Sequence, residues 1–236
     1  VRRMELDYDY IAKLVRKTQE GDSDAFAELY TATYQSQYRF AYQYVKEQVD
    51  FGPRVPNSKG HVACGNYLAG QLEKFGATVT NQYADLIAYD GTLLKARNII
   101  GSYKPENKKR IALFAHWDTR PWADNDPDKK NHYTPILGAN DGASGVGVLL
   151  EIARQIQQQQ PELGIDIIFL DAEDYGTHQA SGKHQEDSWC LGSQYWARNP
   201  HVPGYNARFG ILLDMVGGQQ PTFYRDCLLY TSPSPR

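Results

Sequence analysis

Acidic and histidine side chains follow directly on several apolar stretches of this sequence. The stretches RIALFA, GIDIIFLDA and GILL lead into HWD, ED and D, and a further aspartate lies in the glycine-rich turn GANDGASG. The residues concerned are His116, Asp118, Asp141, Glu173, Asp174 and Asp214. Ligands of open α/β sheets bind beyond the carboxyl ends of the strands, so we expect these side chains at one edge. Imidazoles and carboxylates that converge there are typical of a zinc site with a general base, and therefore of an enzyme.

Asp141 lies in the turn GANDGASG, between a loop and a helix. Gly138, Gly142 and Gly145 allow the backbone to bend tightly there. A carboxylate at such a turn can reach a metal above the sheet, or it can cap the helix that follows. Its combination with the acidic strand ends favours metal binding.

Glu173 and Asp174 come directly after a strongly apolar strand. Successive side chains at a strand end point in different directions. One carboxylate can therefore bind a metal while the other stays free as a base. The alternative is a solvated acidic loop, which the apolar strand before it makes the weaker interpretation.

The remaining candidates leave two interpretations open. His116 with Asp118 can be a metal ligand with an orienting carboxylate, or a histidine in a hydrogen-bond network. Asp214 can end a strand or join the site. The other histidines lie in loops or polar stretches, and we interpret them as surface residues. They are His61, His132, His178, His184 and His201.

Composition restricts the function classes. The 236 residues carry a formal net charge of −3 and have a pI near 6.1, which gives no pull toward nucleic acid or anionic membranes. No apolar run reaches the roughly 18 residues of a membrane helix, and the start VRRMELDYDY lacks signal-peptide features. The cysteines Cys64, Cys190 and Cys227 have no C-x-x-C spacing and no adjacent base. With neither a G-x-S-x-G elbow nor a P-loop, a nucleophilic hydrolase is not favoured.

The elements that must position the candidate residues lie between about 44 and 226. Leu68, Leu72 and Phe75 form the apolar stripe of a helix that Gly76 can end. Alternating strands and helices then predict a three-layer α/β/α fold with a mixed, mostly parallel sheet. Strands are predicted at 77–87, 94–103, 110–116 and 164–171, a buried strand at 208–215, and a helix at 146–159.

The two ends of the chain differ from this pattern. Residues 1–43 predict a helical hairpin that breaks at GDS, with Asp22 or Ser23 as the cap of its second helix. LVRKTQEGDSDAFAELYTATYQSQYRFAY resembles the start of region 2 of extracytoplasmic-function sigma factors. The charges of this segment nearly cancel, so DNA binding is not expected. Residues 227–236 are interpreted as an unstructured tail that does not continue the α/β pattern.

HWD, GANDGASG, LDAEDYG and LLDMVGG together resemble the zinc peptidases of family M28, over about 44–227. Within that fold, DSWCLGSQYWA and VDFGPRVPNSKGH are similar to glutaminyl-peptide cyclotransferases (glutaminyl cyclases) of the Bacteroidetes type. The resemblance implies a zinc aminopeptidase/phosphorylase-like fold that is C-terminally truncated here. It implies an acyltransferase that converts the N-terminal glutamine of peptides or proteins into pyroglutamate.

The resemblance also assigns roles. Asp141 and Asp174 match zinc ligands, with Asp174 replacing a glutamate of animal cyclases. Glu173 matches the general acid/base, and Asp214 matches a carboxylate that holds the substrate amine or relays its proton. His116 and Asp118 match positions that cyclases keep without a second zinc. Trp189 lies where aromatic residues line the cyclase pocket.

One Zn²⁺ is implied for a cyclase and two for the alternative, an M28 aminopeptidase, in which His116 and Asp214 are ligands and Asp141 bridges. A second alternative is a sigma-like transcription protein. Cyclases of this type take a third ligand from a downstream histidine, which this sequence lacks, so we expect weak activity or none. Neither a nucleic-acid partner nor a membrane span is expected. The protein is expected to be a monomer. The full-length relatives are expected in the cell envelope or periplasm.

Overall fold

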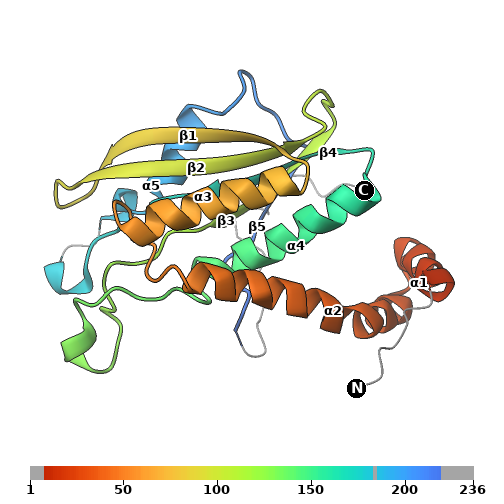
Figure 1. Cartoon of the computed structure of the whole chain (residues 1–236), viewed down its shortest axis with the longest axis horizontal. Helices are drawn as coiled ribbons and strands as arrows, with labels where there is room; N and C mark the ends of the chain where they lie inside the picture. Colours follow the sequence, from red (N-terminus) through yellow and green to blue (C-terminus); the bar gives the residue numbers. More distant parts are fainter. Residues whose placement is uncertain (1–7, 183–184, 219–236) are drawn as a thin grey trace.

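The computed structural model describes residues 8–182 and 185–218 (Figure 1). The helices and strands that the sequence predicts occur in the predicted order, and a further helix, at 191–198, was not predicted. Asp22 caps the second helix by accepting hydrogen bonds from the Asp24 and Ala25 N–H groups. The helices are α1 (Tyr8–Gln19), α2 (Ser23–Val49), α3 (Lys59–Lys74), α4 (Ala143–Gln159) and α5 (Leu191–Arg198). The strands are β1 (Thr78–Ile87), β2 (Leu93–Tyr103), β3 (Arg110–His116), β4 (Gly164–Leu170) and β5 (Gly210–Leu212).

The five strands form one mixed sheet in the order β1-β2-β4-β3-β5. β2 runs antiparallel to β1 and to β4, whereas β3 runs parallel to both β4 and β5. The parallel strands therefore lie together, and the carboxyl ends of β3, β4 and β5 meet at one edge. This is the arrangement that the site prediction requires.

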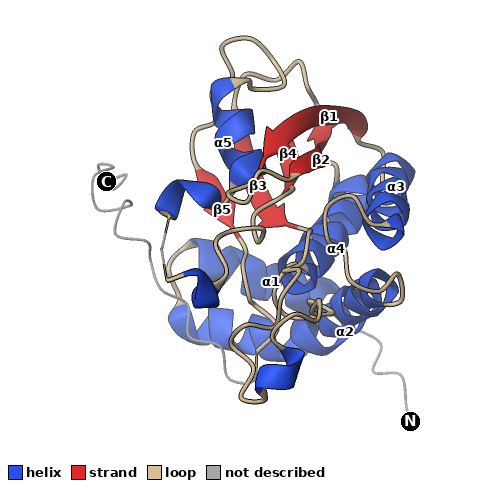
Figure 2. Cartoon of the chain, turned by 90° about the vertical axis from the view of Figure 1, so that its left-hand side faces the viewer, coloured by secondary structure: helices blue, strands red, loops and turns tan. Residues whose placement is uncertain are grey.

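Helices cover both faces of the sheet, so the three-layer prediction is confirmed (Figure 2). On β4, Ile165, Ile167 and Phe169 point to the face that α3 and α4 cover. Ile168 points to the opposite face, where Trp196 of α5 packs. The alternation explains why β4 is buried along its whole length and reads as a continuous apolar run.

The predicted helical hairpin is present, and its second helix belongs to the same body as the sheet. α2 continues without a break through residue 43 and packs against α4 (Figure 1). A Cβ at Gly147 would come within 2.8 Å of the Ala41 carbonyl oxygen, so glycine permits this close approach. Gln48 also donates a hydrogen bond to the first residue of α4. The division at 43 and the sigma resemblance stay predictions, and 227–236 lies outside the described residues.

The prediction of a buried strand at 208–215 is wrong in one respect. Only Gly210–Leu212 forms a strand, and Ile211 and Leu212 are 44% and 58% exposed. Within the described residues β5 pairs with β3 alone, and its apolar side chains stay largely exposed. No helix in the described part of the chain is long and apolar enough to span a membrane.

Candidate metal centre

The predicted site residues do converge at the carboxyl edge of the parallel strands. His116 is the last residue of β3, and its Nε2 lies 3.0 Å from Asp141 Oδ1 and 3.4 Å from Asp214 Oδ1. Its Nδ1 lies 3.5 Å from Asp118 Oδ1. The imidazole thus sits among three carboxylates that come from three separate segments.

These close contacts are not hydrogen bonds of good geometry. The His116 ring is buried, and neither of its nitrogens has a hydrogen-bond partner. Oδ2 of the buried Asp174 also has none. Buried polar atoms in proteins are rarely left unpaired, so the residues fit a bound cation better than a closed hydrogen-bond network.

Two overlapping groups of side chains in the described residues can each hold a metal ion. In both groups the ligand atoms lie within 4.8 Å of one another, and both contain His116. The groups are His116, Asp141 and Asp174, and His116, Glu173 and Asp214. Nitrogen and carboxylate oxygen donors of this kind suit Zn²⁺.

Asp141 does not cap the helix that follows it. Gly142 occupies the N-cap position of α4, without a side-chain capping bond, and has a φ of +93°. A Cβ at Gly142 would lie 2.4 Å from the Asp118 carbonyl oxygen. The glycine turn therefore brings the Asp141 backbone against the end of β3, and its carboxylate reaches His116.

Glu173 and Asp174 lie on a tight turn after β4. Both of their backbone N–H groups donate to the Asp118 carboxylate, over 3.0 Å and 3.1 Å. Ala172, just before them, is in the left-handed region with a φ of 52°. Asp118 therefore binds the backbone of this turn in addition to facing His116. The sequence did not indicate the first of these two contacts.

Burial controls the proton affinities of this pair. Desolvation, with a smaller contribution from the Asp118 charge, raises the pKa of Glu173 to about 7. The same causes raise the pKa of Asp174 to about 8. A carboxylate that takes up and releases a proton near neutral pH suits a general acid/base.

The pKa values of His116 and Asp141 both shift in the direction that favours the charged form. Burial alone lowers the pKa of His116, but close contact with Asp118, Asp141 and Asp214 raises it well above its usual range. Contact with His116 in turn lowers the pKa of Asp141. Burial raises the pKa of both Cys64 and Cys190 to about 12, so neither thiol is a nucleophile at neutral pH.

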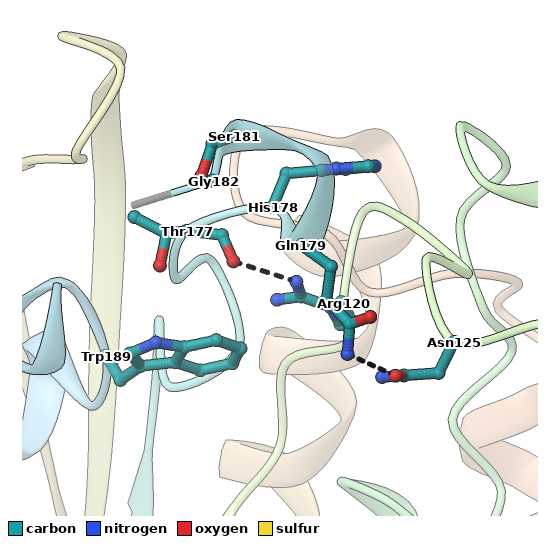
Figure 3. Close-up of a pocket in the computed structure, with 8 residues that line it drawn as sticks. All are labelled: Arg120, Asn125, Thr177, His178, Gln179, Ser181, Gly182 and Trp189. Carbon is teal, nitrogen blue, oxygen red and sulfur yellow. Dashed lines mark hydrogen bonds between the residues drawn. The ribbon is translucent and has the colours of Figure 1, made fainter. Parts of the chain in front are cut away.

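A pocket of about 420 Å³ lies beside this centre (Figure 3). The Arg120 guanidinium connects the two, because it donates to the Asp174 carbonyl oxygen and lies 4.6 Å above the Trp189 ring. The buried Asp124 carboxylate holds the same guanidinium. The residues that line the pocket are Arg120, Asn125, Thr177, His178, Gln179, Ser181, Gly182 and Trp189.

The structure corrects the interpretation of the other histidines as surface residues. His61 is 3% exposed and stacks on Trp117, with ring centroids 4.3 Å apart. His178 is buried and lines the pocket, where it stacks on Tyr133. The His201 side chain is also buried. His132 is partly buried and His184 lies outside the described residues. The partners of His61 and His178 lie far away in the sequence, so polar neighbours in sequence were a poor guide to their burial.

The model of peptidase family M28 matches residues 98–233, more than half of the chain. The chain belongs to this family. The crystal structure of Bacteroides thetaiotaomicron glutaminyl cyclase bound to N-acetylhistamine is 85% identical, with a TM-score of 0.76 over 77% of this chain and 63% of that one. Tannerella forsythia glutaminyl cyclase is 60% identical, with a TM-score of 0.77 over 79% and 64%.

The glutaminyl-peptide cyclotransferase of Drosophila melanogaster is 26% identical over 183 residues, which are 73% of this chain and 47% of that protein. The M28 chain described here therefore spans about half of this curated relative and under two thirds of the solved cyclases. These similarities agree with the sequence motifs that resemble bacterial cyclases.

Proposed function

We propose that the protein is a zinc-dependent glutaminyl-peptide cyclotransferase, which converts an N-terminal glutamine into pyroglutamate and releases ammonia. The observation that carries this proposal is Glu173, a half-buried carboxylate whose pKa is raised to about 7 beside the candidate ligands. The similarity to bacterial glutaminyl cyclases supports the same reaction.

Asp141 and Asp174 would hold the zinc, and His116 offers a third donor within the same group. When bound, Zn²⁺ supplies Lewis-acid polarisation of the γ-carboxamide oxygen of the glutamine. The remaining chemistry is proton transfer, which the protein's own carboxylates can perform.

Glu173 has the proton affinity that this transfer needs. The free α-amine of the substrate attacks the carbonyl carbon of the γ-carboxamide and forms the new C–N bond. The Glu173 carboxylate takes one proton from that amine and returns it to the departing nitrogen, so that the old C–N bond breaks and ammonia leaves. Asp214, exposed two residues after β5, would hold the substrate amine.

The pocket beside the centre is proposed to receive the peptide beyond its first residue. Its wall combines the Trp189 indole, whose Nε1 is buried without a partner, with side-chain amides and hydroxyls. Such a surface suits the carbonyl groups of a peptide backbone. Its volume of about 420 Å³ lies in the range of small-ligand pockets.

The test is to incubate the zinc-loaded protein at high concentration with a peptide that begins with glutamine. Expected products are ammonia and a peptide that is lighter by one ammonia and blocked at its amino terminus. The sequence leaves weak activity or none as the two expected outcomes, and this proposal requires the first: turnover that is slow but measurable, and that Glu173→Gln abolishes while zinc still binds. Failure of the wild-type protein to form any pyroglutamate would overturn the proposal.

A second candidate function is a two-zinc aminopeptidase. The observation that favours it is the second ligand group, in which His116 joins Glu173 and Asp214. Two bound zinc ions per chain, together with release of the free first amino acid from peptides, would identify this function. One zinc and a pyroglutamyl product would exclude it.

A further inference from the structure

His61 and Asp171 form a buried contact behind the candidate metal centre. His61 Nε2 lies 2.9 Å from Asp171 Oδ1 and 2.8 Å from Oδ2, although the two residues are 110 positions apart. Asp171 is fully buried and His61 is 3% exposed. A buried carboxylate requires compensating donors, so the imidazole N–H is part of what keeps Asp171 in place.

Asp171 itself holds the turn that follows β4. Its carboxylate accepts the backbone N–H groups of Ala172, over 2.7 Å, and of Arg97, over 2.6 Å. Its own N–H donates to the Asn98 side chain. These bonds support Ala172 in its left-handed conformation, which a residue with a Cβ does not adopt without support from its surroundings.

The same turn carries the acidic pair. Asp118 accepts the N–H groups of Glu173 and Asp174 from the side of the metal centre. The carbonyl groups of residues 171–173 accept hydrogen bonds from backbone N–H groups of residues 190–192. The turn is thus held on several sides, and a shift of Asp171 must move the carboxylates that follow it.

His61 also contacts the other strand end that contributes a ligand. It stacks on Trp117, with an angle of 14° between the rings, and Trp117 directly follows His116. His61 lies in the first turn of α3, where the Ser58 hydroxyl accepts its backbone N–H. One side chain from α3 therefore contacts the ends of both β3 and β4.

We propose that His61 is a positioning residue for the metal centre: through Asp171 and Trp117 it sets the two strand ends that present His116 and the Glu173–Asp174 pair. This inference rests on the proposed metal site. Residues that support metal ligands from behind change metal affinity by about 10- to 100-fold when they are replaced.

The test compares zinc affinity and thermal stability in His61→Phe. Phenylalanine keeps a buried ring against Trp117 but removes the donor to Asp171. We expect zinc, measured by competition with a chromophoric chelator, to bind about 10- to 100-fold more weakly, with loss of thermal stability as well. His61→Asn, which is smaller and too short to reach Asp171, should show the same loss if the first variant does not fold.

The matched control removes a donor from a buried aspartate elsewhere on β4. The Tyr205 hydroxyl donates to Asp166, which lies near the other end of that strand. Tyr205→Phe should lower the melting temperature and leave zinc affinity unchanged. A His61 variant that loses stability in the same way but keeps wild-type zinc affinity would overturn the proposal.

The two possible failures are distinguishable. A wild-type protein that binds no zinc would refute the proposed metal centre, and this inference with it. Folded His61 variants that bind zinc as tightly as the wild-type protein would refute the positioning role alone. The peptide reaction is not needed for either measurement.

Discussion

Glu173→Gln in the metal-free protein should remove the part of the pH dependence of stability that comes from Glu173, and leave the part that comes from Asp174. Burial raises the pKa of Glu173 from its ordinary value of 4.5 to about 7 in the folded protein. The folded state therefore binds the proton more tightly than the unfolded state, and stability falls as pH rises from the unfolded pKa through the folded one. At about 1.4 kcal/mol for each pKa unit, this change corresponds to about 3 kcal/mol.

Urea unfolding in the presence of a chelator measures the effect. Near pH 5 the variant and the wild type should differ by less than about 1 kcal/mol, and near pH 8 the variant should be more stable by about 2–3 kcal/mol. The matched control is Glu73→Gln, which replaces an exposed glutamate of α3 and should follow the wild type throughout. A Glu173→Gln profile with the same decline as the wild type would refute the assigned burial of this carboxylate.

Three further predictions concern the centre and its supports. Zinc should raise the melting temperature more near pH 8 than near pH 6, because Asp174, whose pKa burial raises to about 8, must lose its proton; a larger rise near pH 6 in scanning fluorimetry would contradict this. Arg120→Leu should cost about 3–5 kcal/mol in urea unfolding, since it leaves the buried Asp124 unpaired, and adding Asp124→Leu should recover part of the loss. Gly145→Ala should cost about 1–3 kcal/mol, because its Cβ would lie 2.1 Å from a backbone carbonyl beyond β5, whereas Gly70→Ala, with open space around it, should not destabilise.

The sequence was informative about the elements because their signals are local. The apolar run of β4, the stripe Leu68, Leu72 and Phe75 on α3, and the Asp22 cap each depend on residues a few positions apart. The convergence of the candidate ligands followed from one rule of sheet topology, which places the ends of parallel strands side by side. No comparable rule predicted that the strand at 208–215 would be short and exposed. That outcome depends on what packs above β5, which is a property of the tertiary structure.

The residues that support the site were missed for a related reason. A hydrogen bond between His61 and Asp171 joins α3 to the end of β4, and the sequence does not show the register that brings them together. One signal was present nevertheless. His61 stands seven positions before Leu68, on the same buried stripe of α3 as Cys64 and Leu72, so helical periodicity places it inside.

A polar residue on an otherwise apolar helical stripe must find a partner in the core, because burying it unpaired is costly. Here the partner is Asp171, which the strand-end rule did not single out, although it lies two residues before Glu173, which the rule did select. Periodicity and the strand-end rule could therefore have been combined: the first identifies a histidine that must be satisfied inside, and the second identifies where buried carboxylates gather. Applied together, they point from His61 to the edge of the sheet that carries Glu173 and Asp174, which is where the structure places it.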